Sequence, residues 1–210
     1  MSPITSIATL LELSPELPEL ARWLVADGPP DAWLAAGCVV QSVWNGLTGK
    51  RPGFGILDYD VVYFDPDLSA ETEAIWGRRL STAFPGLKLD VKNQARVHLW
   101  YPEKFGLQIP AFASVAAAMC GWPTTATATA ARLSDQQHGR WVILAPFGTD
   151  DLTSLVLRPN RTLVNEAIYR AKTSRWAGLW PELRVLPWEA AIGPFELNGP
   201  VDLDPARVGP

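Results

Sequence analysis

The sequence predicts an α+β fold with helices toward both ends of the chain and strands in its middle. Three observations predict it. Apolar residues recur at helical spacing before residue 50 and again after residue 160. Between them, two strand-like segments are separated by a helical one, and two further strand-like segments follow as a hairpin. This order is not the regular strand–helix repeat of an α/β protein.

Composition and charge narrow the class of protein. The chain has 210 residues, 48% of them hydrophobic, which is typical of a soluble globular protein. Its net charge of −4 gives no reason to expect extensive nucleic-acid binding. The longest apolar run, Ile109 to Trp122, is too short to span a bilayer and predicts a buried helix. The first residues do not resemble a signal peptide, so we expect a cytoplasmic protein without a membrane partner.

The N-terminal third is expected to be helical. The apolar pattern from Ile7 to Ala26 is interrupted near Pro15 and Pro18, which predicts two helical pieces. A further helix is predicted from Pro30 to Ala36. After Gly37, apolar residues at helical spacing predict another helix that ends at the Thr48-Gly49 pair, and "KRPGFG" is then a loop.

The middle of the chain alternates between strand and helix. "GILDYDVVYFD" predicts a strand that begins with two acids, and Ser69 is a plausible N-cap for the helix that follows. Pro85-Gly86 ends that helix, and Leu87 to Lys92 alternates as a half-buried strand does. The next stretch either extends this strand or begins a short helix capped by Asn93.

The remaining elements are a hairpin, helices and a tail. "TATATAARL" and "GRWVILAPF" predict two strands joined by the turn "SDQQH". A helix is predicted from Asp150 through Leu157, and another from Thr162 to about Trp176. The residues from Pro194 onward are expected to form an extended arm. We divide the chain into N-terminal helices (1–36), a core (37–160) and a C-terminal helix with its tail (161–210), within one compact domain.

Three carboxylates are the main candidates for a catalytic metal site. Asp58 and Asp60 are two apart in a strand, so they project from the same face and repel one another unless a cation lies between them. If the strand from Leu87 to Lys92 pairs beside theirs, Asp90 reaches the same place. Such an oxygen-rich site suits Mg²⁺ or Mn²⁺, and a pair of these ions can clamp a displacement at phosphorus.

Several residues are candidates for nucleotide binding. Gly37 lies immediately before a helix, whose free N–H groups attract phosphate, unless it only ends the preceding helix. Lys50 and Arg51, in the loop after that helix, could add positive charge. The polar cluster around Arg96 and His98, with Asn93, could contact nucleotide, although a structural ion pair and a core histidine are equally consistent with it.

Longer stretches of the chain resemble a known family. The pattern G-C…D-Y-D…D resembles the signature of the DNA polymerase beta-like nucleotidyltransferase superfamily. "VWNGLTGKRPGFGILDYDVVYFD", "VKNQARVHLWY" and "APFGTDDL…RPN" resemble a bacterial family of nucleotidyltransferase proteins, over about Ala35 to Trp180. The resemblance implies a mixed β-sheet of the polymerase beta-like type flanked by helices, and a nucleoside triphosphate as substrate.

The same resemblance implies roles for individual residues. Asp58 and Asp60 would be the metal-binding pair and Asp90 the third acid. Gly37 and the helix that begins with Cys38 would bind phosphate, although Cys38 stands where a serine is common in the superfamily.

Three functions remain open from the sequence. The leading one is metal-dependent transfer of a nucleoside monophosphate from a nucleoside triphosphate to an unidentified hydroxyl acceptor. A D-x-D nucleotide-sugar glycosyltransferase fits less well, because those enzymes usually build several parallel strands before the motif and only helices are predicted before Asp58. A nucleotide-binding or protein-interaction module without turnover is the third.

Overall fold

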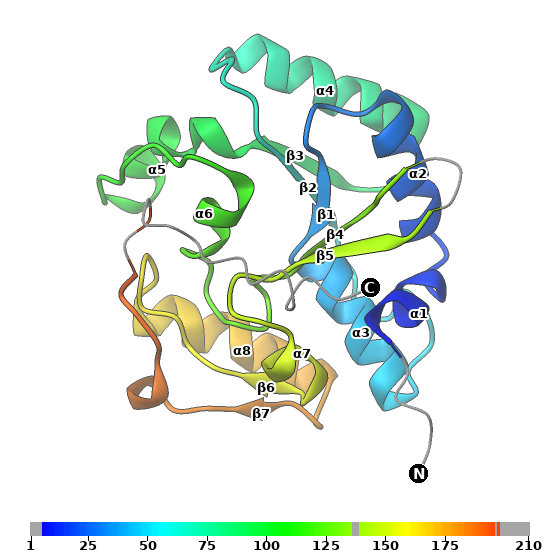
Figure 1. Cartoon of the computed structure of the whole chain (residues 1–210). Coiled ribbons are helices and arrows are strands. Elements are labelled where there is room, and N and C mark those ends of the chain that lie inside the picture. The colour runs from blue at the N-terminus through cyan, green and yellow to red at the C-terminus, as the bar shows by residue number, and fades with distance from the viewer. Residues whose placement is uncertain (1–5, 136–138, 196, 198–210) are drawn as a thin grey trace.

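The computed structural model describes residues 6–135, 139–195 and 197, and it has helices on both faces of a central β-sheet (Figure 1). The fold is α+β, as predicted. The α-helices are, in chain order, α1 (Ile7–Glu12), α2 (Leu17–Asp27), α3 (Gly37–Thr48), α4 (Ala70–Ala83), α5 (Val97–Phe105), α6 (Val115–Met119), α7 (Asp150–Thr153) and α8 (Glu166–Leu179).

The central sheet is mixed and has five strands in the order β3-β2-β1-β4-β5. Within this five-stranded sheet only β2 and β3 pair in parallel, and α4 is the crossover between them. The strands are β1 (Trp33–Ala35), β2 (Tyr59–Tyr63), β3 (Leu89–Asn93), β4 (Ala130–Leu133) and β5 (Trp141–Leu144), and the short β6 (Val156–Leu157) and β7 (Arg184–Val185) pair separately. The condition set for Asp90 is therefore met, because β3 pairs directly beside the acidic strand β2.

The middle strand of this sheet lies where the sequence predicts a helix. The predicted helix from Pro30 to Ala36 is wrong, because Trp33–Ala35 forms β1 between β2 and β4. All three residues are buried, so the segment shows neither alternation nor helical periodicity. Asp31 has a positive φ of 47°, which is incompatible with a helix at that point.

The two faces of the sheet are covered by different elements. Leu34, Val61 and Tyr63 belong to the larger core, which they share with α1, α2, α3 and the end of α8. Trp33, Ala35 and Val62 point to the other face, where α6 packs. Figure 1 shows α5 and α6 on the side of the sheet away from α1 and α2.

The C-terminal part of the chain packs directly on α3 and on the loop that precedes the acidic strand. The Trp180 Nε1–H donates a hydrogen bond to Asn45 Oδ1 (2.9 Å), and Asn45 Nδ2 donates to the Phe54 carbonyl (3.0 Å). Gly55 has φ +74°, and a Cβ there would lie 2.4 Å from the Trp180 ring. Only glycine allows this close approach, so Trp180 fixes the loop that leads to Asp58.

Other sequence predictions differ from the structure in extent. Ser69 caps α4 by accepting a hydrogen bond from the Thr72 N–H, as predicted. The ambiguous stretch after Asn93 is a 3₁₀ turn followed by α5, while the helix predicted from Asp150 ends at Thr153. The hairpin exists, but part of its turn, residues 136–138, and nearly all of the predicted C-terminal arm lie outside the described residues.

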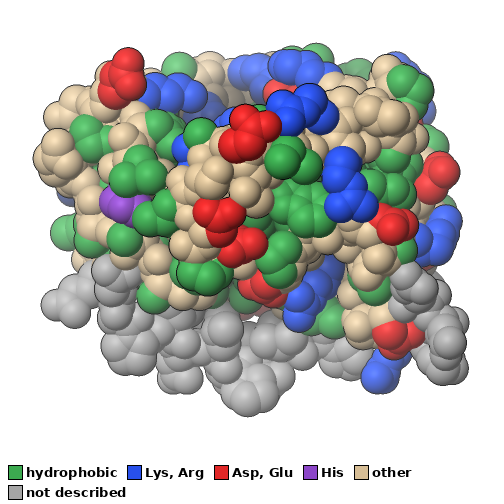
Figure 2. Space-filling model, turned by 90° about the horizontal axis from the view of Figure 1, so that it is seen from above, with side chains coloured by type: hydrophobic (Ala, Val, Ile, Leu, Met, Phe, Trp, Pro, Cys, Tyr) green, Lys and Arg blue, Asp and Glu red, His purple; other side chains and the backbone are tan. Residues whose placement is uncertain are grey.

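Surface features are consistent with the modest net charge. Acidic and basic side chains are interspersed on the face that Figure 2 shows, with hydrophobic ones between them. Within the described ranges, the structure contains no helix that is both long and apolar enough to cross a membrane.

Candidate active site

The sheet places two of the predicted carboxylates side by side. Asp60 and Asp90 are register partners in the parallel pair of β2 and β3, and neighbouring strands lie about 4.8 Å apart. Asp58 directly precedes β2 and is two residues from Asp60, so it projects from the same face. Tyr59 and Val61 point the other way, into the larger core. The alternation read from the sequence therefore brings the three acids to one region.

The electrostatics of Asp60 show that this region is acidic. Burial, then the charges of Asp58 and Asp90, raise the pKa of the Asp60 carboxyl from 3.8 to about 6. The Lys172 ammonium group and a hydrogen bond from the Gly37 backbone N–H act in the opposite direction. Asp60 is thus a partly buried carboxylate that lacks enough positive charge nearby.

Two lysines on β3 and just before it neutralise the outer acids. Lys88 Nζ lies 3.4 Å from Asp58 Oδ2, and Lys92 Nζ lies 2.8 Å from Asp90 Oδ1. Over the described part of the chain, no three His, Cys, Asp or Glu side chains are already grouped as metal ligands. Both ion pairs are half-exposed, so they contribute little stability and can exchange for other partners.

The start of α3 lies against Asp60. Gly37 is the first residue of α3, so it does not end a preceding helix. A Cβ built on Gly37 would lie 3.9 Å from Asp60 Oδ2 and 3.1 Å from Gln41 Nε2. The Gly37 N–H donates to the Asp60 carboxylate, so the positive end of the α3 dipole lies beside the carboxylates.

The Cys38 thiol is buried and does not face that space. Its S–H donates to the Ala35 carbonyl at 3.3 Å, and burial raises the pKa of the thiol to about 12. The Cys38 side chain is therefore not placed to contact a phosphate group. The backbone of Cys38 belongs to the first turn of α3.

Gly37→Val is expected to weaken nucleoside triphosphate binding about tenfold or more, because a branched side chain fills the space between α3 and Asp60. Gly37→Ala is the matched control, since a single methyl group needs only a small shift of the Gln41 side chain. The affinities are measured by titration calorimetry. Equal affinities for a folded Gly37→Val protein and the natural one would remove Gly37 from the site.

Lys50 and Arg51 follow the end of α3 that is far from Gly37. The 12 residues of α3 separate them from Gly37, a length of roughly 18 Å at 1.5 Å per residue. Lys50 instead lies 4.0 Å from Glu182 and over the Phe54 ring. A role for Lys50 and Arg51 in nucleotide binding stays a prediction.

Asn93 and Arg96 hold the polypeptide chain rather than facing open space. The Asn93 amide accepts from the N–H groups of Asp65 and Ala95 and donates to the carbonyls of Asp65 and Asp67, at 2.8–3.1 Å. Arg96 forms a largely buried ion pair with Glu73. These contacts match the structural interpretation of the polar cluster.

Two further polar residues relevant to the candidate site are His98 and Lys172. The Nδ1 atom of His98 is buried without a hydrogen-bond partner among the described residues, and a nucleotide contact for it stays a prediction. Lys172, on α8, is close enough to Asp60 to lower its pKa, and the sequence analysis missed it. It lies more than 80 residues beyond Asp90, so only the fold could reveal it.

Known proteins share both the sequence pattern and the fold. The model of a family described as nucleotidyltransferase matches residues 27–185. An NMR structure described as revealing a CCA-adding enzyme head domain is similar to this chain, with 27% identity and a TM-score of 0.71. The similarity covers 88% of this chain and 97% of that one. None of the curated proteins is detectably similar. Because the family model spans most of the chain, the protein belongs to this nucleotidyltransferase family.

Proposed function

We propose that the protein transfers a nucleoside monophosphate from a nucleoside triphosphate to a hydroxyl group, with a divalent cation bound by its carboxylates. One observation carries the proposal: Asp60 lies in register with Asp90 and directly beside the start of α3. Carboxylates for a cation and the positive end of a helix for a phosphate chain thus meet at one place.

The residues present fit a hard cation such as Mg²⁺ or Mn²⁺. Carboxylate oxygens are the ligands these ions prefer, and Asp58, Asp60 and Asp90 supply them. Burial, and then the charges of Asp58 and Asp90, raise the pKa of Asp60, and a bound cation would stabilise its charged form. When bound, the cation supplies charge neutralisation at the transferring phosphoryl group and at the leaving pyrophosphate.

The chain's own groups position the reactants. The positive end of the α3 dipole attracts the β- and γ-phosphates, and Lys172, whose charge acts on Asp60, contacts the α-phosphate. The acceptor oxygen bonds to the α-phosphorus as the bond from phosphorus to pyrophosphate breaks. Pyrophosphate leaves with the electron pair, and the hydroxyl proton passes to the Asp90 carboxylate.

The proposal is tested by incubating the full chain with each nucleoside triphosphate and Mg²⁺ and measuring pyrophosphate release. We expect release with at least one of the four, and its loss in Asp58→Asn and on chelation of the cation. Triphosphate binding without release under all conditions, including addition of cell extract as a source of acceptor, supports the non-catalytic module instead.

Asp90→Asn is expected to lower turnover by about 10²-fold or more while triphosphate affinity changes less than about twofold, because the carboxylate acts on the acceptor in the transition state. The measurement is a comparison of kcat with the triphosphate Kd. Asp27→Asn, an exposed substitution at the end of α2, is the matched control and keeps natural turnover. If Asp90→Asn turns over normally, the third acid is elsewhere.

A further inference from the structure

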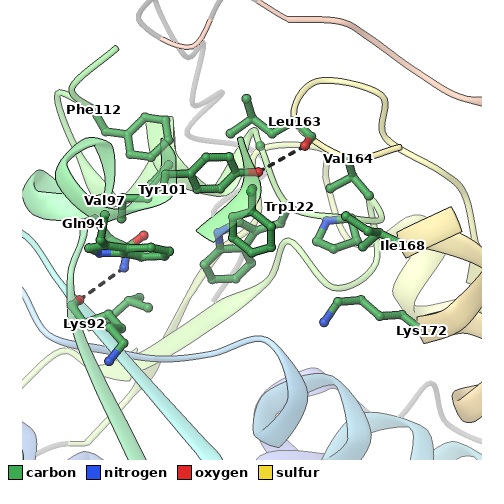
Figure 3. Close-up of a pocket in the computed structure, with 16 residues that line it drawn as sticks. Lys92, Gln94, Val97, Tyr101, Phe112, Trp122, Leu163, Val164, Ile168 and Lys172 are labelled. Carbon is green, nitrogen blue, oxygen red and sulfur yellow. Dashed lines mark hydrogen bonds between the residues drawn. The ribbon is translucent and has the colours of Figure 1, made fainter. Parts of the chain in front are cut away.

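An apolar pocket lies beside the carboxylates, between β3, α5, α6 and α8. Its volume is about 260 Å³, just below the usual range of roughly 300–1,000 Å³ for small-molecule sites, so it suits a ligand of one or two rings. Trp100, Tyr101, Phe105, Phe112 and Trp122 supply much of its lining. Figure 3 shows Tyr101, Phe112 and Leu163 at one end, and the ammonium groups of Lys92 and Lys172 at the other.

Strand register fixes where the pocket lies relative to the carboxylates. Val62 and Lys92 line it, and each follows an acid, Asp60 or Asp90, by two residues on the same face of the sheet. The pocket therefore begins about 6.6 Å along the strands from the acids.

The start of α3 lies in the opposite direction. β1 is antiparallel to β2, with Ala35 opposite Asp60 and Trp33 opposite Val62. The chain therefore runs away from the pocket as it leaves β1, and Gly37 lies toward the Asp58 end. The phosphate-binding end and the apolar pocket are on opposite sides of Asp60.

This arrangement matters because an in-line displacement has its entering and leaving oxygens on opposite sides of phosphorus. With pyrophosphate at the start of α3, the entering hydroxyl must come from the side of the pocket. The position of the triphosphate in this geometry is the one given by the proposed function.

The polar groups of the lining indicate the chemistry of the occupant. Polar groups are few in this lining, and two of them are partly engaged: Gln94 Nε2 donates to the Lys92 carbonyl (3.2 Å) and the Tyr101 hydroxyl donates to the Leu163 carbonyl (3.1 Å). A nucleobase buried here would leave much of its polar edge against apolar side chains, which is costly. An apolar ring system has no such penalty, and it packs well against aromatic side chains.

We infer that this pocket binds the acceptor, and that the acceptor is a small hydroxyl compound with a largely apolar, aromatic body rather than a nucleic-acid end. Its hydroxyl group points toward Asp90 at the lysine end of the pocket.

The test uses 2-naphthol as the probe and the full chain as the protein, with binding followed by fluorescence and calorimetry. Ile168→Trp, on the pocket wall, should weaken naphthol binding tenfold or more because the indole fills the space. Ile75→Trp, the same change at an exposed position of α4 outside the pocket, should leave it unchanged. If Ile168→Trp does not fold, Phe105→Ala at the exposed rim should weaken binding at least threefold.

A second arm separates the acceptor from other occupants. Naphthol should bind equally well with and without a saturating triphosphate and Mg²⁺. Competition between the two places the nucleobase in the pocket and overturns the inference, as does displacement of naphthol by a short cytidine- and adenosine-containing oligonucleotide. Absence of saturable naphthol binding overturns it too. Since naphthol binding is measured without nucleotide, these results are independent of whether pyrophosphate release confirms the proposed function.

Discussion

Asp60→Asn is expected to abolish cation-dependent turnover and, at the same time, to stabilise the cation-free protein above pH 6. Turnover should fall by about 10³-fold or more, because several kcal/mol of transition-state charge stabilisation depend on the carboxylate–cation interaction. The free energy of unfolding at pH 7.5 should rise by about 1–3 kcal/mol, since an amide avoids the cost of holding a partly buried charge beside Asp58 and Asp90.

The sign of the pH dependence follows from the two pKa values of Asp60. The folded protein holds the proton up to about pH 6, whereas the ordinary value is 3.8. Between these values the folded state binds more protons, so the contribution of Asp60 to stability falls as pH rises through this window. The gain from Asp60→Asn should therefore vanish by about pH 4.

Urea denaturation at pH 4, 6 and 7.5 measures this window, with Asp27→Asn as the control that shows no such trend. Mg²⁺ should stabilise the natural protein and not Asp60→Asn, because only a ligand that binds the folded state raises its stability. An Asp60→Asn protein that is destabilised at pH 7.5 would show that this carboxylate is held by favourable contacts and is not a strained site residue.

Asn93→Ala is expected to lower the free energy of unfolding by about 4 kcal/mol. The substitution removes four hydrogen bonds between the Asn93 amide and backbone groups of residues 65, 67 and 95, each with a net contribution of about 1 kcal/mol. Denaturation by urea measures the loss.

The matched control for this change is Asn165→Ala. Asn165 accepts a single hydrogen bond from the Ile168 N–H as the N-cap of α8, and we expect a loss of about 1 kcal/mol. If Asn93→Ala keeps its stability and loses triphosphate affinity instead, Asn93 contacts the nucleotide as the sequence analysis first suggested.

Local patterns predicted the strands that carry the acids. The alternation in Leu87 to Lys92 and the cap at Ser69 are both local signals, and both are confirmed in the structure. That β2 and β3 are neighbours was only a condition for the role of Asp90, and the fold supplies it.

The missed features depend on contacts between distant segments. β1 is only three residues long and buried on both faces, so its residues carry no periodic signal. Lys172 reaches the acidic region through the packing of α8, while the length of α3 takes Lys50 away from Gly37. A local sequence pattern carries no information about distances between segments that are far apart in the chain.

The packing of Trp180 on α3 and Gly55 has a consequence for how the protein is made. Residues of the acidic strands leave the ribosome well before Trp180, which follows about 90 residues after Asn93. At a synthesis rate of roughly 5–20 residues per second, about 4–18 s pass before Trp180, whose ring covers the core, is synthesised. During that interval the apolar side of α3, including Trp44, lacks its final cover. We therefore expect chains stalled before residue 180 to engage chaperones during translation, and full-length chains to be released from them.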